Sequence, residues 1–150
     1  MTTYTDRGLG GRTPWHLWVV GGLSLLWNLF GVYDLTMTLS QGEEYLRSMK
    51  MTDPQVAYFN AMPAWVYAPW ALGVFGAAMG SILLLLRRRW ALHAFVLSLV
   101  GLLISMVYTF LLSDGGRVMG DANYFQIVIL AACLFFVWYA WRMTKRGVLR

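Results

Sequence analysis

Long apolar runs alternate with short polar segments along this chain, and the length of the runs predicts the fold. Four runs hold roughly 20 or more residues with almost no charge, and about 20 helical residues cross the ~30 Å hydrocarbon core of a bilayer. The predicted spans are residues 15–38, 64–86, 90–112 and 122–141. We therefore expect an all-α membrane protein, with four transmembrane helices in an antiparallel bundle that forms a single domain over residues 1–150.

The composition is typical of a protein that is dissolved in a bilayer. Hydrophobic residues make up 59% of the chain and charged residues 13%, whereas a soluble domain has about 45–50% and about 25%. The net charge of +5 would suggest nucleic acid if it formed one patch on a soluble domain. Because the charges lie at the ends of the apolar runs, they indicate membrane topology instead, and we expect no nucleic-acid partner.

The basic residues also predict the orientation of the helices, because cytoplasmic loops are enriched in lysine and arginine. Nine of them precede the first span, separate the second span from the third, or follow the fourth: Arg7, Arg12, Arg87, Arg88, Arg89, Arg142, Lys145, Arg146 and Arg150. The other two loops hold Arg47, Lys50 and Arg117. We expect both termini in the cytoplasm. The triplet Arg87–Arg89 alone is compatible with a nucleic-acid patch, but we interpret it as a topology signal that also suits lipid head groups.

The loop between the first two spans is the only long one, and it predicts one or two short helices. Glu43 and Arg47 are spaced for an i,i+4 ion pair. Thr52 or Asp53, followed by Pro54, indicates a helix start, because proline favours the first helical position. This loop is either a packed connector or a lid over an outer cavity.

Polar residues in the first span recur every three or four positions and so share one helix face. The face consists of Ser24, Asn28, Gly31, Asp34 and Thr38. Asn28 lies well inside the membrane, where it forms an interhelical hydrogen bond or contacts a substrate. Asp34 lies near the outer interface, as a helix-end residue or as a ligand or proton site.

Small residues on the second span predict close packing between helices. Gly73, Gly76 and Gly80 recur at intervals of three and four, and residues 76–80 form a GxxxG pattern. Such residues let helix backbones approach one another closely. We expect these three glycines to form a helix-packing face.

Polar and aromatic groups gather in the outer halves of the spans and predict an outward-open pocket. Aromatic rings there would stack on a sugar-like ligand, and amides would bond its hydroxyl groups. The candidate substrate-binding residues are Asn28, Asp34, Tyr67, Tyr108 and Gln126.

The sequence contains no pattern typical of a nucleophile, a phosphate loop or a metal site. His16 and His93 lie at similar depth near the cytoplasmic interface, but no other ligand pattern accompanies them. Cys133, the one cysteine, has no partner for a disulfide within the chain. We expect no enzyme activity, no cofactor and no metal.

Short stretches spread over nearly the whole chain carry a family resemblance. They are His16–Gly21, Leu26–Asn28, Gly31, Asp34, Met37, Thr38, Ala57–Phe59, Ala61–Trp65, Trp70–Val74, Gly80–Ser81, the leucine run with its arginine triplet, Arg142–Met143 and Arg146–Arg150. Together they make the chain similar to a family of small bacterial four-span proteins that are often labelled sugar transporters. The resemblance implies a bacterial inner-membrane protein more firmly than it implies transport.

Two hypotheses about function follow from these patterns. The first is a small carrier or binder of a sugar-like solute, in which Asp34 is the coupling carboxylate. Transport would be more plausible for a homo-oligomer, because no continuous polar path crosses one protomer. The second is a non-catalytic accessory or assembly protein that acts through helix packing and through contacts with lipid or a membrane-protein partner.

Overall fold

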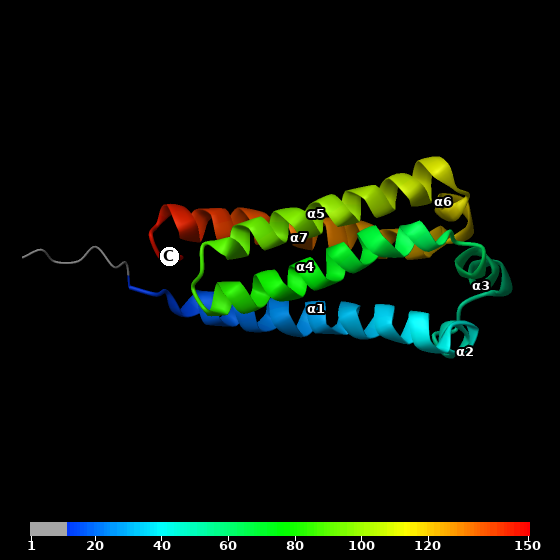
Figure 1. Ribbon diagram of the computed structural model, residues 1–150, viewed down its shortest axis with the longest axis horizontal. Coiled ribbons are helices and arrows are strands. Elements are labelled where there is room, and N and C mark those ends of the chain that lie inside the picture. The colour runs from blue at the N-terminus through cyan, green and yellow to red at the C-terminus, as the bar shows by residue number, and fades with distance from the viewer. Residues whose placement is uncertain (1–11) are drawn as a thin grey trace, which may run out of the picture.

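The computed structural model describes residues 12–150, and four long helices dominate them. They are α1 (Trp15–Gln41), α4 (Tyr67–Leu85), α5 (Trp90–Val107) and α7 (Asn123–Lys145), which lie lengthwise beside one another (Figure 1). All four belong to segments long and apolar enough to cross a membrane. The predicted all-α four-span fold is therefore confirmed, and the chain is a multi-pass membrane protein. Arg7 of the predicted basic group lies outside the described residues.

The observed ends of the helices differ from the predicted ends where the local chemistry allows the helix to continue. α1 runs on to Gln41 and stops at Gly42, whose φ of +54° suits glycine. α7 runs on to Lys145 because its last turns are amphipathic. The guanidinium of Arg142 lies 5.6 Å from the centre of the Trp138 ring, so the charged group covers an apolar one.

The helices pack as an open series and not as a closed ring. α1 packs on α4, α4 packs on α5, and α5 packs on α7. α1 and α7 stand at the two ends of this series, and among the described residues they make few direct contacts. This arrangement leaves a space between the first and last helices.

Glycines allow the closest approach, which is between α4 and α5. Gly76 faces Ala94 and Ser98, and an added Cβ would lie 3.3 Å from the Ala94 carbonyl oxygen. At Gly101 of α5 a Cβ would lie only 2.6 Å from the carbonyl oxygen of Pro69. The same added Cβ at Gly101 would lie 2.8 Å from the backbone nitrogen of Gly73. Backbone therefore meets backbone at this interface, as small residues permit in membranes.

One end of the bundle, here called the Arg-rich end, carries Arg87–Arg89 and residues 142–150. The chain folds back after α7, and the Val148 N–H donates to the Met143 carbonyl at 3.0 Å. The side chains of Val148 and Leu149 are buried in an apolar cluster with residues of all four long helices. The final residues are therefore part of the packed structure.

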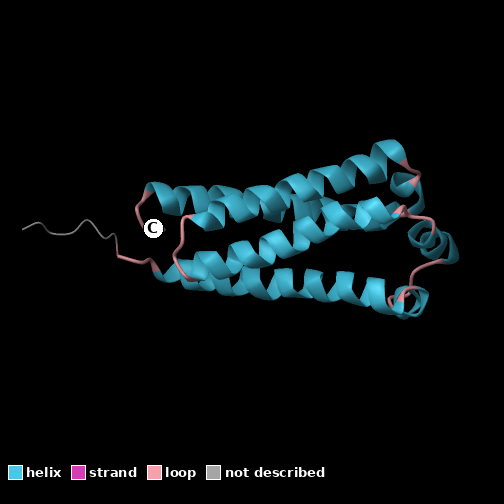
Figure 2. Ribbon diagram, viewed as in Figure 1, coloured by secondary structure: helices cyan, strands magenta, loops and turns pink. Residues whose placement is uncertain are grey.

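The opposite end, here called the capped end, is covered by short helices (Figures 1 and 2). They are α2 (Glu43–Ser48), α3 (Asp53–Asn60), α6 (Gly115–Val118) and the 3-10 turn η3 (Gly120–Ala122). The predicted short helices in the long loop are thus confirmed. A 3-10 turn η1 (Ala64–Val66) leads into α4, and a π-helical turn η2 (Tyr108–Leu112) ends the third span.

The predicted signals in the long loop act as expected. The Arg47 Nε atom lies 2.8 Å from Glu43 Oε1, and another nitrogen of the same guanidinium lies 2.8 Å from Asp53 Oδ1. At the start of α3 the Thr52 N–H donates to Gln55 Oε1 at 3.0 Å. The Gln55 amide then reaches the Met119 carbonyl at 3.4 Å, which ties α3 to the loop before α7.

Candidate functional site

Asn28 lies in a buried polar cluster between α1 and α4. Its side chain is 8% exposed, and its Nδ2 atom lies 3.0 Å from Ser81 Oγ, 3.2 Å from Ser24 Oγ and 3.3 Å from the Ala77 carbonyl oxygen. The Ser24 and Ser81 hydroxyl groups also bond each other. The amide hydrogens of Asn28 are therefore directed at the interface between the two helices.

Asp34 lies near the capped end of α1, where α2 binds it. The Tyr45 hydroxyl of α2 donates to Asp34 Oδ1 at 2.7 Å. Burial of the Tyr45 ring, followed by this hydrogen bond, raises the pKa of Tyr45 to about 12. The hydrogen bond connects the long loop to the first span.

Tyr67 and Tyr108 belong to an aromatic cluster at the capped end. The cluster consists of Tyr58, Phe59, Trp65, Tyr67, Trp70 and Tyr108. Tyr67 stacks on Trp70 with ring centres 5.9 Å apart, and Tyr108 meets Trp65 edge-on at 5.6 Å. These rings therefore contact one another.

Gln126 lies in the first turns of α7, and its Oε1 atom is buried without a hydrogen-bond partner among the described residues. The same holds for Asn123 Oδ1. The structure thus brings two of the five predicted site residues, Tyr67 and Tyr108, into one cluster. Asn28 and Asp34 bond to different partners.

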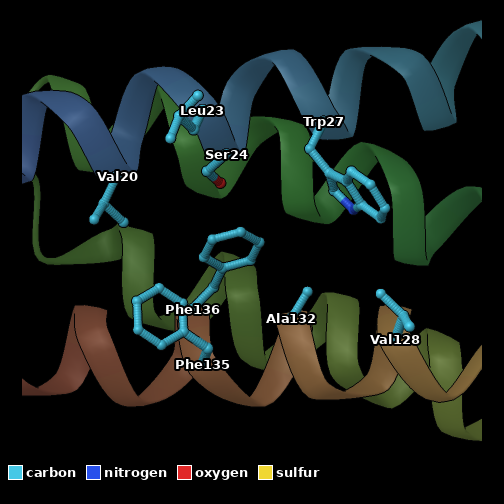
Figure 3. Close-up of a pocket in the computed structure, with 8 residues that line it drawn as sticks. All are labelled: Val20, Leu23, Ser24, Trp27, Val128, Ala132, Phe135 and Phe136. Atoms are coloured by element: carbon cyan, nitrogen blue, oxygen red, sulfur yellow. The ribbon is translucent and has the colours of Figure 1, made fainter.

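An open groove lies between α1 and α7 in the membrane-spanning region. This groove has a volume of about 440 Å³, which is in the range of small-molecule sites. α1 and α7 each contribute four residues to its walls (Figure 3): Val20, Leu23, Ser24, Trp27, Val128, Ala132, Phe135 and Phe136. Apart from Ser24 and the indole nitrogen of Trp27, the lining is hydrocarbon.

The depth of the groove follows from helix geometry. Ser24 comes nine residues after Trp15, and at 1.5 Å per residue this is about 14 Å along the helix. The hydrocarbon core is about 30 Å thick, so the groove lies near the middle of the membrane. Leu23, Val128 and Phe135 of its lining are exposed, so the groove opens at the lateral surface of the bundle.

Two contacts between α1 and α7 bracket the groove. Toward the Arg-rich end, His16 Nδ1 and the Tyr139 hydroxyl are 2.6 Å apart. Toward the capped end, the rings of Trp27 and Phe125 have centres 5.9 Å apart. The helices meet at these two levels, and the other residues that line the groove lie between Trp27 and Tyr139.

The one hydroxyl group in the lining is already engaged. The Ser24 hydroxyl group bonds Ser81 Oγ and accepts a hydrogen bond from the Asn28 amide. Its hydrogen bonds are therefore made within the α1–α4 interface. The groove therefore presents little unsatisfied polarity to an occupant. Its chemistry suits a hydrocarbon chain and not a sugar.

Sequence reasoning missed this groove. Its α7 wall follows a helical spacing in which the small Ala132 stands one turn from Val128 and from Phe136. The same spacing is also compatible with ordinary helix packing. Ala132 lines a groove only because α1 and α7 are separated in the fold, which the sequence pattern does not show.

Among residues 12–150 no group of three or more histidine, cysteine, aspartate or glutamate side chains is placed to hold a metal ion. His16 bonds Tyr139, and His93 lies beside Trp90 with ring centres 5.0 Å apart.

Comparison of the chain with protein-family models, with curated proteins and with solved structures found no match. The fold and the groove therefore define a class only: a four-span membrane protein with an apolar groove between its first and last helices. The family resemblance in the sequence stays a prediction.

Proposed function

We propose that this protein is a non-catalytic accessory protein of the membrane that binds the hydrocarbon chain of a membrane lipid in the groove between α1 and α7. The observation that carries the proposal is the groove itself, whose walls are apolar and whose ends are bracketed by two helix contacts. A bound chain would bridge the first and last helices. It would thereby complete the packing of the open helix series.

The physical basis of such binding differs from that of a water-exposed pocket. A lipid chain gains no hydrophobic free energy on leaving the bilayer for the groove, because both surroundings are apolar. Binding must come from dispersion contacts with rigid walls such as Trp27, Phe135 and Phe136. We therefore expect selection by chain shape and length, with modest affinity.

The family resemblance supports a location in the cell, and the charge pattern supports an orientation. We propose that the protein resides in a bacterial inner membrane with both termini in the cytoplasm, so that the Arg-rich end faces the anionic cytoplasmic leaflet. The three basic residues Arg47, Lys50 and Arg117 would then lie on the outer side.

A carrier of a sugar-like solute is the second candidate. It is favoured by the aromatic cluster that holds Tyr67 and Tyr108, because such rings stack on sugars. It is also favoured by Asp34, the single carboxylate of the four long helices α1, α4, α5 and α7. Against it, Asn28 already bonds three groups of the protein, and Tyr108 is only 8% exposed. We therefore rank it below lipid binding.

The groove can be tested with two adjacent alanines. Ala132 lines the groove, whereas Ala131 is exposed and does not line it. The full chain and the variants Ala132→Trp and Ala131→Trp are placed in lipid nanodiscs that contain a phospholipid with a diazirine at mid-chain. After irradiation, labelling of residues 20–27 and 128–136 is compared by mass spectrometry with that of residues 96–104 of α5, where five of the nine side chains are exposed: Val96, Leu97, Val100, Leu103 and Ile104.

Lipid binding predicts preferential labelling of the two groove segments in the wild type and in Ala131→Trp. The added indole of Ala132→Trp should bring that labelling down to the level of residues 96–104. Equal labelling of all three segments in the wild type would overturn the proposal. Circular dichroism on each variant confirms that the helices are retained.

The rival hypothesis has its own experiment. Uptake of radiolabelled sugars is measured in vesicles with the wild type, with Asp34→Asn and without protein. Uptake above the empty vesicles that is lost in Asp34→Asn would replace lipid binding by transport as the better proposal. Uptake equal to that of empty vesicles, across sugars and imposed cation gradients, would leave the groove as the functional site.

A further inference from the structure

Two distant parts of the sequence, both rich in arginine, meet at the Arg-rich end. The Arg150 N–H donates to the Arg87 carbonyl at 2.8 Å, and the Arg89 N–H donates to the Arg150 carbonyl at 3.1 Å. This reciprocal pair of backbone bonds attaches the segment after α7 to the link between α4 and α5. The burial of Val148 and Leu149 holds the segment from its other side.

A small, open basic cavity lies where the two segments meet. It has a volume of about 210 Å³ and is lined by Leu86, Arg87, Arg88 and Arg150. Leu86 immediately follows the last residue of α4, so the cavity lies where the helix leaves the hydrocarbon, at the level of lipid head groups.

No acidic side chain among the described residues neutralises this cluster. The ion pairs of residues 12–150 join Arg47 to Glu43 and to Asp53, and both lie at the capped end. Within the same residues the Arg87 guanidinium donates to Thr13 Oγ1, and the side chains of Arg88 and Arg150 bond no protein group. Among the described residues, the cavity thus gathers three arginines without an acidic side chain to pair with them.

The geometry goes beyond what a topology signal needs. Orientation in a membrane depends on the number of positive charges in a short loop and not on their arrangement. Here Arg87 takes a φ of +56°, a conformation that residues other than glycine rarely adopt. Together with the two backbone bonds to Arg150, this turn brings arginines from both segments around one cavity.

We propose that this cavity binds a phosphate group that carries net negative charge, either as the head group of an anionic phospholipid or as a free phosphate. Guanidinium groups present planar forks of N–H donors that match phosphate oxygens in pairs. A basic pocket at the end of transmembrane helices is a site where anionic head groups bind. This site is separate from the groove, so either proposal stands or fails without the other.

The matched control is the third arginine of the triplet. Arg89 carries the same charge, but its side chain does not line the cavity. The full chain and the variants R87Q, R88Q, R150Q and R89Q are reconstituted in nanodiscs of neutral phospholipid with a small fraction of anionic phospholipid. The anionic lipid that remains bound is measured by native mass spectrometry after release from the nanodisc.

Loss of one charge-assisted hydrogen-bonding group should reduce affinity about tenfold or more. We expect that loss in R87Q, R88Q and R150Q, with R89Q close to the wild type. The charge-preserving variants R88K and R150K keep the topology signal, and they should still bind more weakly than the wild type because lysine lacks the fork. An equal loss in R89Q, or full binding in R88K and R150K, would reduce the effect to net charge and overturn the proposal.

The two sources of phosphate are separated by competition. Inorganic phosphate and pyrophosphate are titrated into the wild type in nanodiscs of neutral lipid only, and heat of binding is recorded. Heat of phosphate binding in the wild type that is absent in R88Q identifies a free phosphate as the ligand. If the wild type gives no heat with phosphate but retains the anionic lipid, the ligand is the lipid head group. Neither heat nor retained lipid in the wild type would refute the site.

Discussion

At the scale of single residues, hydrogen bonding in hydrocarbon decides where polar side chains lie. An unpaired amide in the bilayer is costly, so Asn28 is expected to find partners on a neighbouring helix. It finds Ser81 and the Ala77 carbonyl on α4 and Ser24 on its own helix. The polar face of the first span therefore contributes to the α1–α4 interface.

Removal of the Asn28 amide should loosen that interface. We expect Asn28→Ala to destabilise the protein by about 0.6–2 kcal/mol, as for other polar contacts inside membranes. The measurement is reversible unfolding in mixed micelles of increasing denaturing-detergent fraction. Thr36→Val is the control, because the Thr36 hydroxyl is exposed and bonds only the Val32 carbonyl of its own helix. Equal destabilisation by both variants would contradict an interhelical role for Asn28.

Acid should weaken α2 through one exposed carboxylate. A hydrogen bond from Arg47, followed by the charge of Arg47, lowers the pKa of Glu43 below its ordinary value of 4.5. A depressed folded-state pKa means that the stabilisation is present above about pH 4.5 and is lost as the pH falls through the folded-state value. Amide exchange of residues 43–48, corrected for intrinsic rates, should therefore be faster at pH 3 than at pH 6.

The matched variant for this pH effect is Glu43→Gln, which cannot titrate at that position. It should show a smaller pH dependence, with the remainder arising from Asp53, the second partner of Arg47. The same pH dependence in the wild type and in Glu43→Gln would show that Glu43 does not stabilise α2.

At the scale of helices, the distance between backbones is set by residues without side chains. α4 and α5 approach closely enough that Gly101 lies against the carbonyl of Pro69 and the amide of Gly73. These are backbone atoms, which cannot rotate away from an added methyl group as a flexible side chain can.

Gly101→Ala should therefore force α4 and α5 apart. We expect a loss of about 1–3 kcal/mol, the usual cost of overpacking, measured as a shift in the same detergent unfolding curve. Gly22→Ala on α1 is the control, because an added Cβ there would meet no atom within 4 Å. If Gly101→Ala were as stable as Gly22→Ala, this result would contradict the close approach of the α4 and α5 backbones at Gly101.

At the scale of the whole molecule, an even number of spans brings the start of α1 and the segment after α7 to one end of the bundle (Figure 1). Arg87–Arg89 lie at that same end, whereas α2 and α3 lie at the other. The distribution of charge along the sequence thus becomes a difference between two ends of one molecule, on which orientation depends.

The orientation is testable with two probes at opposite ends. A reporter that is active only in the cytoplasm should be active when it is fused after Arg150. In intact cells, Glu43→Cys should react with a membrane-impermeant thiol reagent added from outside. Cys133 lies within α7 and serves as the background in a chain that lacks the new cysteine. An exported reporter, or a cysteine at position 43 that reacts only after lysis, would invert the orientation.

The local pattern of the sequence was sufficient for the elements and for several of their ends. Hydrophobic length predicted the four spans, and Thr52, Pro54 and the Glu43–Arg47 spacing predicted the short helices of the long loop. These features depend on residues within a few positions of one another and on the thickness of a bilayer, so they can be read along the chain.

Only the tertiary structure decided how the helices associate, because that depends on contacts between residues far apart in sequence. The open series leaves a groove between α1 and α7, and it places Arg150 beside Arg87. The polar residues that a linear reading gathered into one outward pocket bond to separate partners, as Asn28 does with Ser81 and Asp34 with Tyr45. In a membrane, apolar faces pack on lipid as readily as on one another, so hydropathy determines which segments cross the bilayer while interhelical shape and hydrogen bonding determine the sites between them.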